Sequence, residues 1–304
     1  MMSTVWVARE EIATAVADLP GVRVELYDGG DDVPGPADRV EFYVPVLLPR
    51  PRSLELMDHM PRLQVVQLQT AGVDHVRPHV PAGVTLCNAR GAHDAGTAEW
   101  AVGAIIASRR EFPEFTLAQR EEHWAYRRTE TLTDAKVLIV GYGSIGAALE
   151  RRLEPFEVEI VRVARSARPG VHALEDLPDL LPAADVVVLL VPATAETKGL
   201  ADAGFLARMK DGALLVNAAR GTVVDTSALV AETSRGRLRA AMDVTDPEPL
   251  PPEHPLWHCP GVFITPHVAG STPASTRRIA RLVREQLRRH LSGEHLQNVI
   301  TGTY

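Results

Sequence analysis

Short apolar runs alternate with helical patterns along most of the chain. In the first part of the sequence, the apolar runs lie at 4–8, 22–26, 40–48, 63–69 and 84–87. Helical patterns separate some of these runs, near 10–19 and 52–60. An alternation of strands and helices predicts a parallel sheet with helices on both faces.

A second series of apolar runs begins at 136–141. It continues at 158–164, 185–191, 213–219, 239–244 and 262–267. These runs are continuously apolar instead of alternating with polar residues, as expected for strands that are covered on both faces. The second series therefore predicts a second parallel sheet.

Two long helical patterns, at 95–122 and 271–291, flank the second series. We place the first sheet and the last helix in one domain, formed by residues 1–95 and 275–304, with residues 96–274 as an inserted domain. The predicted fold class is α/β with two doubly wound parallel-sheet domains. The two chain crossings between the domains would act as a hinge.

Length and composition support a globular protein of two domains. The chain has 304 residues, of which 45% are hydrophobic and 23% charged, which excludes a disordered or collagen-like chain. A net charge of −7 predicts no attraction to nucleic acid or anionic lipid.

No long apolar run predicts a membrane span, and Arg9, Glu10 and Glu11 lie where a signal peptide needs its apolar core. We therefore expect a cytoplasmic protein. Cys87 and Cys259 lie far apart and have no metal-binding or redox spacing, so no metal site is expected, although a disulfide stays open.

A glycine motif, GYGSIG at 141–146, joins the strand at 136–140 to a helical pattern. In this context Gly141 permits a tight turn, Gly143 permits close approach of a pyrophosphate, and Gly146 permits close packing of helix on strand. Backbone N–H groups at the start of the helix would hold the phosphates. The predicted cofactor-binding residues here are Gly141, Gly143, Ser144, Ile145 and Gly146. The alternative is a tight turn without a ligand.

The next strand ends at Arg165, Ser166 and Arg168, and no acidic residue lies there. An Asp or Glu at this place binds the ribose 2′-hydroxyl of NAD, whereas arginine and serine can bind a 2′-phosphate. We therefore predict that NADP(H) is preferred and that NAD(H) is a second possibility. The alternative is that both arginines are only surface charges.

Three further segments follow the glycine motif in a specific order. VNAARGTVVD (216–225), MDVTDPEPLP (242–251) and TPHVAGST (265–272) resemble the D-isomer-specific 2-hydroxyacid dehydrogenase family, which includes glyoxylate and hydroxypyruvate reductases. The resemblance covers about residues 63–290. It implies a Rossmann cofactor domain inserted into a flavodoxin-like substrate (catalytic) domain.

The resemblance also assigns roles to individual residues. It implies that Arg220, Glu248 and His267 form the catalytic trio. It implies a loop whose backbone N–H groups bind the substrate carboxylate, formed by Ala71, Gly72 and Val73. It implies further cofactor contacts at Thr97, Pro192, Ala218 and Asp243.

Elementary chemistry supports the trio independently. Reduction of a 2-oxo acid needs a hydride at the carbonyl carbon and a proton at its oxygen, and histidine is suited to supply that proton near neutral pH. A neighbouring carboxylate such as Glu248 favours the imidazolium form of His267. Arg220 can bind the substrate carboxylate and polarise the ketone.

These residues predict an NAD(P)-dependent oxidoreductase that reduces a small 2-oxo acid such as glyoxylate or hydroxypyruvate to the D-2-hydroxy acid. One alternative is a cofactor-sensing, corepressor-like binding protein on the same fold, and another is a dehydrogenase for a bulkier 2-oxo acid. Formate dehydrogenases of this superfamily do not keep the His–Glu pair, so Glu248 argues against that chemistry. The pattern at 95–122 and the loop after it resemble the family's dimer arm, so a homodimer is expected.

Overall fold

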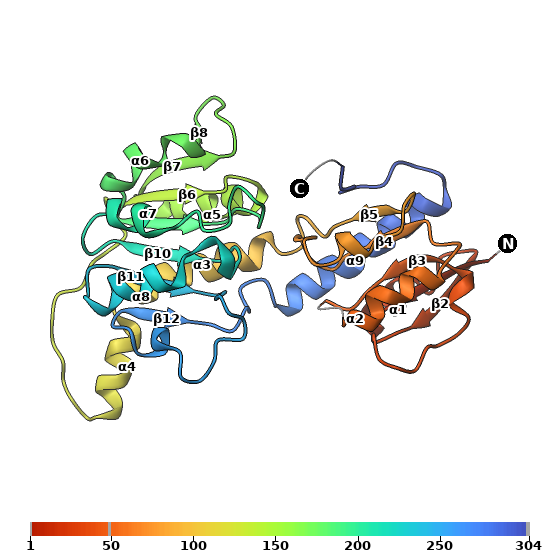
Figure 1. The fold of residues 1–304 in the computed structure, drawn as a ribbon, viewed down its shortest axis with the longest axis horizontal. Helices are drawn as coiled ribbons and strands as arrows, with labels where there is room; N and C mark the ends of the chain where they lie inside the picture. The colour runs from red at the N-terminus through yellow and green to blue at the C-terminus, as the bar shows by residue number, and fades with distance from the viewer. Residues whose placement is uncertain (1, 48–49, 302–304) are drawn as a thin grey trace. The chain divides into compact units, whose positions relative to one another are not determined.

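A computed structural model describes residues 2–47 and 50–301. The chain divides into two compact units (Figure 1). One unit comprises Met1–His93 with Thr272–Tyr304, and the other comprises Asp94–Ser271.

The first unit is built on a parallel sheet with the strand order β2-β1-β3-β4-β5. This order is that of the flavodoxin-like doubly wound folds. Val5 of β1, the second strand in this order, pairs with Val24 on one side and Phe42 on the other. The strands are β1 (Ser3–Val7), β2 (Val22–Leu26), β3 (Val40–Val44), β4 (Val65–Gln67) and β5 (Thr85–Cys87). β3 and β4 are shorter than the predicted runs at 40–48 and 63–69, and position 48 lies outside the described residues.

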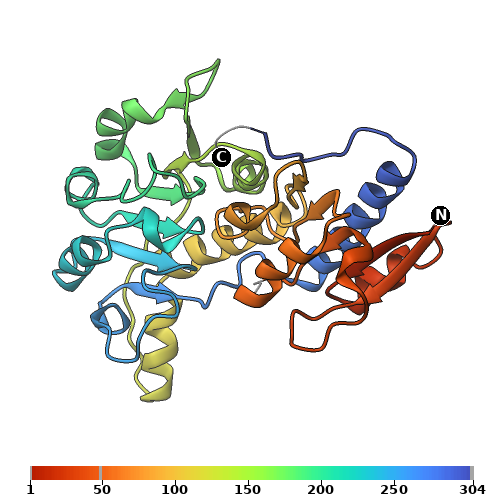
Figure 2. The same cartoon turned by 45° about the vertical axis from the view of Figure 1, so that its right-hand side comes forward.

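Helices cover the first sheet because each has one apolar stripe. In α9 (Pro273–Leu291), Ile279, Val283 and Leu287 are buried. Thr272, the residue directly before the helix, caps it because its side chain accepts a hydrogen bond from the Ser275 N–H. α9 packs beside α1 (Glu10–Val16) against the sheet, as Figures 1 and 2 show. The short α2 (Pro51–Glu55) lies in the same unit.

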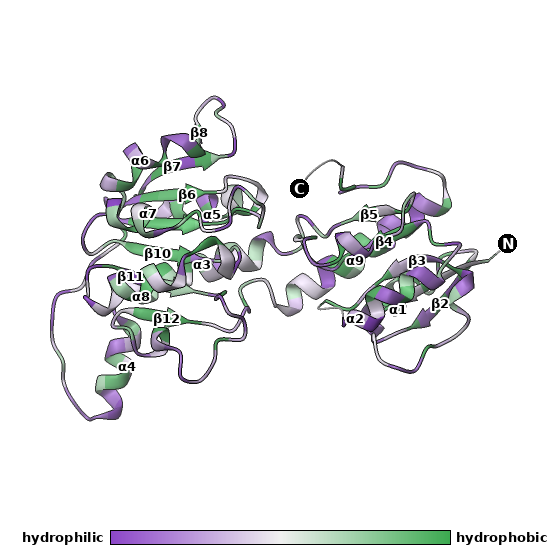
Figure 3. Ribbon diagram, viewed as in Figure 1, coloured by the Kyte–Doolittle hydropathy of each residue, from purple (hydrophilic) through white to green (hydrophobic). Residues whose placement is uncertain are grey.

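The second unit is built on a longer parallel sheet with the order β12-β11-β10-β9-β6-β7-β8. This is the strand order of a Rossmann fold with one additional strand. The strands are β6 (Lys136–Val140), β7 (Glu159–Ala164), β8 (His172–Ala173), β9 (Val186–Leu189), β10 (Leu214–Asn217), β11 (Arg239–Met242) and β12 (Val262–Ile264). Their apolar composition is visible in Figure 3, and β9 and β10 are buried throughout. The predicted α/β class with two parallel sheets is therefore confirmed.

Helices lie on both faces of the second sheet. α3 (Asp94–Arg109) and α5 (Ser144–Leu153) pack together over one face. The other α-helices described in this unit are α4 (Phe112–Arg120), α6 (Leu177–Leu180), α7 (Ala203–Arg208) and α8 (Thr226–Ser234). In this arrangement β6 has β9 on one side and β7 on the other, so the strand order changes direction there. Open α/β sheets bind ligands beyond the carboxyl ends of their strands at such a point.

The prediction of one continuous helix over 95–122 is wrong. The helical conformation is interrupted between α3 and α4 at Glu111, whose φ of 53° lies in the left-handed region. Pro113 then lies in the first turn of α4, where its missing N–H costs no helical hydrogen bond. The sequence carries two signals of this break, the polar run at 108–111 and Pro113 shortly after it, which the prediction of one continuous helix did not use.

Cys87 and Cys259 are both buried and free, so the disulfide left open by the sequence is not formed. Within residues 2–47 and 50–301, no helix combines the length and the apolar character needed to cross a bilayer. The same residues contain no group of three or more His, Cys, Asp or Glu side chains placed to hold a metal ion.

Candidate active site

Two positions of the glycine turn between β6 and α5 need glycine because a Cβ there would lie too close to other atoms of the protein. Gly141 has a φ of 105°, and a Cβ there would lie 2.5 Å from the carbonyl carbon of Leu190. A Cβ at Gly146 would lie 3.1 Å from the Gly141 carbonyl oxygen. These contacts explain the tight turn and the close packing of α5 on β6.

Gly143 is different, because nothing inside the protein requires it. Its φ is −103°, and a Cβ built there would meet no atom within 4 Å. The space in front of it, next to the N-terminus of α5, fits a group that must approach the backbone closely. The first-turn N–H groups of Ser144, Ile145 and Gly146 have no partner within an α-helix, and such groups bind anions. The residues present therefore fit the pyrophosphate of a dinucleotide.

Arg165, Ser166 and Arg168 follow the carboxyl end of β7, and all three are exposed. The structure brings one of them to the glycine turn, since Nη2 of Arg168 donates a hydrogen bond of 2.7 Å to the carbonyl oxygen of Tyr142. Tyr142 is not among the cofactor residues predicted from the sequence, and its only sequence signal is its place inside the glycine motif.

Three other predicted cofactor residues lie at the start of α3 and at the ends of strands. Thr97 is buried in the first turn of α3. Pro192 follows β9, and its carbonyl oxygen accepts a hydrogen bond of 2.5 Å from Thr197 Oγ1. Ala218 follows β10, and its N–H donates to the Leu189 carbonyl oxygen at 3.3 Å.

The predicted catalytic trio follows three neighbouring strands. Arg220 lies after β10, Glu248 after β11 and His267 after β12, and these strands are adjacent in the sheet. Because all three strands are parallel, their carboxyl ends lie at one edge. The topology therefore places the segments that carry the trio side by side.

Glu248 and His267 form a direct pair. Glu248 Oε1 lies 2.6 Å from Nδ1 of His267, and each side chain is 42% exposed. With Nδ1 on the carboxylate, the other ring nitrogen, Nε2, is the one left to face a substrate. His267 has a φ of 54°, a left-handed conformation that is uncommon outside glycine and often marks a functional position.

Asp243 holds the His267 segment in that conformation. Its side chain is only 3% exposed. Oδ1 accepts hydrogen bonds from Thr265 Oγ1 at 2.6 Å and the Val268 N–H at 2.9 Å, and Oδ2 accepts from the Ala269 N–H at 2.9 Å. The Asp243 carbonyl oxygen also accepts from the His267 N–H at 2.7 Å. The resemblance implied only a cofactor contact for this residue, and the structure adds the support of the histidine segment.

Arg220 is half-buried on a loop that is tied to β10. Asn217 Nδ2 donates to the Arg220 carbonyl oxygen at 3.0 Å, and Arg220 Nη1 donates to the Ala219 carbonyl oxygen at 2.8 Å. The next residue, Gly221, lies directly against the backbone of Thr245, three residues before Glu248. The Arg220 and Glu248 segments are therefore packed together.

Ala71, Gly72 and Val73 lie in the first unit, on the loop after β4. Asn88 Nδ2 donates to the Ala71 carbonyl oxygen at 2.7 Å, and Thr70 Oγ1 donates to the Gly72 carbonyl oxygen at 2.7 Å. The Val73 carbonyl oxygen accepts from two N–H groups of the following turn. These hydrogen bonds fix the shape of the loop.

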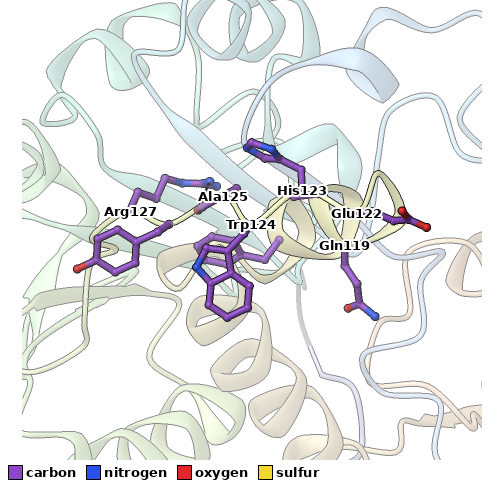
Figure 4. Close-up of a pocket in the computed structure, with 9 residues that line it drawn as sticks. Gln119, Glu122, His123, Trp124, Ala125 and Arg127 are labelled. Atoms are coloured by element: carbon purple, nitrogen blue, oxygen red, sulfur yellow. Dashed lines mark hydrogen bonds between the residues drawn. The ribbon is translucent and has the colours of Figure 1, made fainter.

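A separate pocket of about 570 Å³ lies in α4 and the segment after it (Figure 4). It is lined by Phe115, Ala118, Gln119, Glu122, His123, Trp124, Ala125, Tyr126 and Arg127. None of these residues belongs to the glycine turn or the trio. Trp124 is 91% exposed and Tyr126 is 84% exposed.

Comparison with known proteins shows the family of this chain. Residues 102–269 match the family described as D-isomer specific 2-hydroxyacid dehydrogenase, NAD binding domain. This chain belongs to that family. As a member of the D-isomer-specific 2-hydroxyacid dehydrogenases, it is an oxidoreductase that uses NAD(P), so the family and the enzyme class predicted from the sequence are confirmed.

Two relatives of this dehydrogenase show the range of the family. A glyoxylate reductase of Thermofilum pendens is 35% identical over 257 residues, covering 79% of this chain and 75% of that protein. A D-3-phosphoglycerate dehydrogenase of Archaeoglobus fulgidus is 30% identical over 257 residues, covering 81% of this chain. The match spans only 49% of the phosphoglycerate dehydrogenase, about half its length.

Among solved structures, the dehydrogenase is similar to a D-isomer specific 2-hydroxyacid dehydrogenase from Xanthobacter autotrophicus Py2 in complex with NADPH and MES. The TM-score is 0.85 at 30% identity, covering 99% of this chain and 98% of the other. The fold of the whole chain is thus that of a 2-hydroxyacid dehydrogenase.

Proposed function

We propose that this enzyme reduces a small 2-oxo acid, such as glyoxylate or hydroxypyruvate, to the D-2-hydroxy acid with NADPH as the preferred hydride donor and NADH as a second one. The observation that carries the proposal is the 2.6 Å contact between Glu248 and His267 on segments adjacent to that of Arg220. The glyoxylate reductase relative supports the choice of a small substrate.

His267 is the proton donor in this proposal. The bound cofactor supplies the hydride that forms the new C–H bond at the carbonyl carbon. His267 in its imidazolium form delivers a proton from Nε2 to the carbonyl oxygen, which completes the hydroxyl group. Glu248 stabilises the imidazolium before transfer and orients the ring through Nδ1.

Arg220 binds the substrate through its permanently charged guanidinium group. A planar fork of N–H donors matches a carboxylate and can also reach the ketone oxygen, where negative charge develops as the hydride arrives. The binding of the carboxylate by Ala71, Gly72 and Val73 remains a prediction from the family resemblance.

The cofactor preference follows from the residues beyond β7. Arg165, Ser166 and Arg168 lie where an acid would bind the 2′-hydroxyl of NAD, and no acidic side chain occurs between 160 and 174. Two guanidinium groups and a hydroxyl suit a 2′-phosphate instead. The glycine turn, Thr97, Pro192 and Ala218 are proposed to contact the rest of the dinucleotide.

The enzyme is further proposed to act as a homodimer. Trp124 and Tyr126 expose large aromatic surfaces beside the pocket at α4, and exposed apolar patches of this kind mark interaction sites. A second copy of the chain is the partner that the resemblance to the family's dimer arm implies. A cytoplasmic location remains a prediction.

One assay tests the reaction. Glyoxylate, hydroxypyruvate, pyruvate, phenylpyruvate and a branched-chain 2-oxo acid are each supplied with NADPH and with NADH, and kcat/KM is measured. We expect the highest value for glyoxylate or hydroxypyruvate with NADPH. A preference for phenylpyruvate would assign a bulkier substrate, and no turnover on any acid would favour a cofactor-sensing binding protein.

A further inference from the structure

Tyr142, the second residue of the glycine motif, contacts Arg168 in two ways. Its carbonyl oxygen accepts the 2.7 Å hydrogen bond from Arg168 Nη2, and its ring lies beneath the guanidinium carbon, 5.8 Å from the ring centroid. The second distance is within the range of a cation–π interaction. Arg168 lies 26 residues after Tyr142 in the sequence. The carbonyl oxygen and the ring of Tyr142 together hold the Arg168 side chain at the glycine turn.

The backbone of Arg168 is also held in place. Arg168 and Val171 exchange two backbone hydrogen bonds, of 3.0 and 2.8 Å, across a turn formed by Pro169 and Gly170. Gly170 has a φ of 75°, so proline followed by a left-handed glycine gives the pattern of a type II turn. The backbone position from which the Arg168 side chain extends is therefore fixed.

Tyr142 is itself anchored from the other side. Its hydroxyl group is hydrogen-bonded to Glu150, a residue of α5. Arg162 on β7 pairs with the same carboxylate, and its guanidinium carbon also lies 5.8 Å from the Tyr142 ring centroid. The hydrogen bond from Arg162 lowers the pKa of Glu150, so this carboxylate stays ionised at neutral pH. The ring also packs against the core beneath α3 and α5.

The charges around Tyr142 are not equivalent. Glu150 neutralises Arg162, whereas Arg168 has no carboxylate partner within the part of the chain that the structure describes. Arg168 uses one of its five N–H donors on Tyr142 and keeps the others for a ligand. An anchored and unneutralised guanidinium group is suited to bind an anion.

Arg165 lacks these restraints. It lies in a bend directly after β7, and its side chain makes no hydrogen bond or ion pair with any described residue. Ordering a long, unrestrained side chain around a ligand costs conformational entropy. Arg168 has lost part of that freedom before any ligand binds.

We propose that Tyr142 is a positioning residue for cofactor specificity, which holds Arg168 as the main ligand of a dinucleotide 2′-phosphate. The inference rests on the proposed preference for NADPH and deepens it, because it ranks Arg168 above Arg165 and adds a residue outside the β7 loop. An anion that matches the charge and the N–H donors of Arg168 is negatively charged and accepts several hydrogen bonds. A 2′-phosphate carries two negative charges and accepts hydrogen bonds in this way.

Equilibrium binding of two fragments of the cofactor tests this proposal without an activity assay. Isothermal titration calorimetry is performed with adenosine 2′,5′-diphosphate and with 5′-AMP, which differ only by the 2′-phosphate. We expect the wild-type protein to bind the diphosphate more tightly. Arg168→Ala should weaken binding of the diphosphate about 10- to 100-fold and Arg165→Ala less, while 5′-AMP binding changes by less than about twofold in both.

Tyr142→Leu should weaken binding of the diphosphate about two- to fivefold, the usual size of an exposed cation–π interaction, and leave 5′-AMP binding unchanged. Tyr142→Phe is the matched control, since it keeps the ring and should retain the wild-type ratio of the two affinities. In the Arg168→Ala background, Tyr142→Leu should cause no further loss for the diphosphate.

Three results would overturn the inference. The first is an equal loss of affinity for both fragments in Tyr142→Leu. The second is additive losses of affinity for the diphosphate in the double variant. The third is a larger loss of affinity for the diphosphate in Arg165→Ala than in Arg168→Ala. If the wild-type protein binds both fragments equally, the NADPH preference fails together with this inference. Reduction of 2-oxo acids with NADH would still be measured separately, so the reductase proposal is tested on its own.

Discussion

Gly221 lies so close to Thr245 that a Cβ on Gly221 would sit 1.9 Å from the Thr245 carbonyl oxygen and 2.1 Å from its carbonyl carbon. Both atoms belong to the backbone, which cannot move aside as a flexible side chain could. A second contact joins the same segments, because Thr226 Oγ1 donates to the Asp246 carbonyl oxygen at 2.8 Å. Any side chain at position 221 must therefore separate the segment of Arg220 from that of Glu248.

Gly221→Ala is expected to lower both activity and stability. Forced separation of the segments should cost about 1–3 kcal/mol of unfolding free energy and lower kcat about 100-fold, since small misplacements of reacting groups are costly. Steady-state kinetics and thermal unfolding measure the two effects. Gly103→Ala is the control, because a Cβ there meets no atom within 4 Å, and it should leave kcat unchanged. A Gly221→Ala enzyme with wild-type kcat would contradict the packing described.

His267→Ala should lower kcat by about 10²- to 10⁴-fold, which is the usual contribution of a general acid. The dissociation constant of NADPH, measured by fluorescence, should stay within about twofold, because in the proposed reaction the imidazole donates a proton and does not hold the cofactor.

Glu248→Gln serves as the partner experiment, since it keeps the size of the side chain and removes the charge at Nδ1. It should reduce kcat less than His267→Ala and should shift the pH dependence of kcat/KM. Identical pH profiles for Glu248→Gln and the wild-type enzyme would show that the pair has no role in proton transfer.

Glu150→Gln should destabilise the protein in a pH-dependent way. The pKa of Glu150 is lowered in the folded state, chiefly by the hydrogen bond from Arg162, so its unfolded pKa is the higher one. Its contribution to stability is therefore complete above the unfolded value, about 4.3, and is lost as the pH falls through the folded value.

The difference in unfolding free energy between wild type and Glu150→Gln should thus be about 1–3 kcal/mol at pH 7 and shrink below about pH 4. Urea unfolding at several pH values measures it. Glu159→Gln is the matched control, because Glu159 pairs with Lys136 with 62% of its side chain exposed and should change stability by less than about 0.5 kcal/mol. A pH-independent loss in Glu150→Gln would rule out the charge as its cause.

Replacing Trp124 and Tyr126 together by lysine should convert the proposed dimer to a monomer. Both side chains are almost fully exposed in the single chain, and two buried charges at an interface would oppose association. Light scattering after size-exclusion chromatography gives the mass directly. Trp257→Lys, at a residue that is 47% exposed, provides the comparison and should remain a dimer. A monomeric wild-type protein would refute the proposed assembly.

The apolar pattern predicted most strands of the fold because burial on both faces demands continuous apolar runs, as in β9 and β10. It failed where a local conformation decides, as at Glu111, whose left-handed φ separates α3 from α4 within the stretch predicted as one helix. It also overestimated β3 and β4, since an apolar residue beyond a strand can be buried in a loop, as Leu68 is.

The sequence by itself determined the two-sheet α/β class, the dinucleotide motif and the family, because these depend on the order and spacing of residues along the chain. Only the tertiary structure decided that β10, β11 and β12 are neighbours, that Asp243 supports the His267 segment, and that Tyr142 anchors Arg168. Each of these contacts joins residues at least 24 positions apart or depends on the pairing order of strands. Such relationships arise from how the strands pair and how side chains pack, and no local pattern in the chain encodes them.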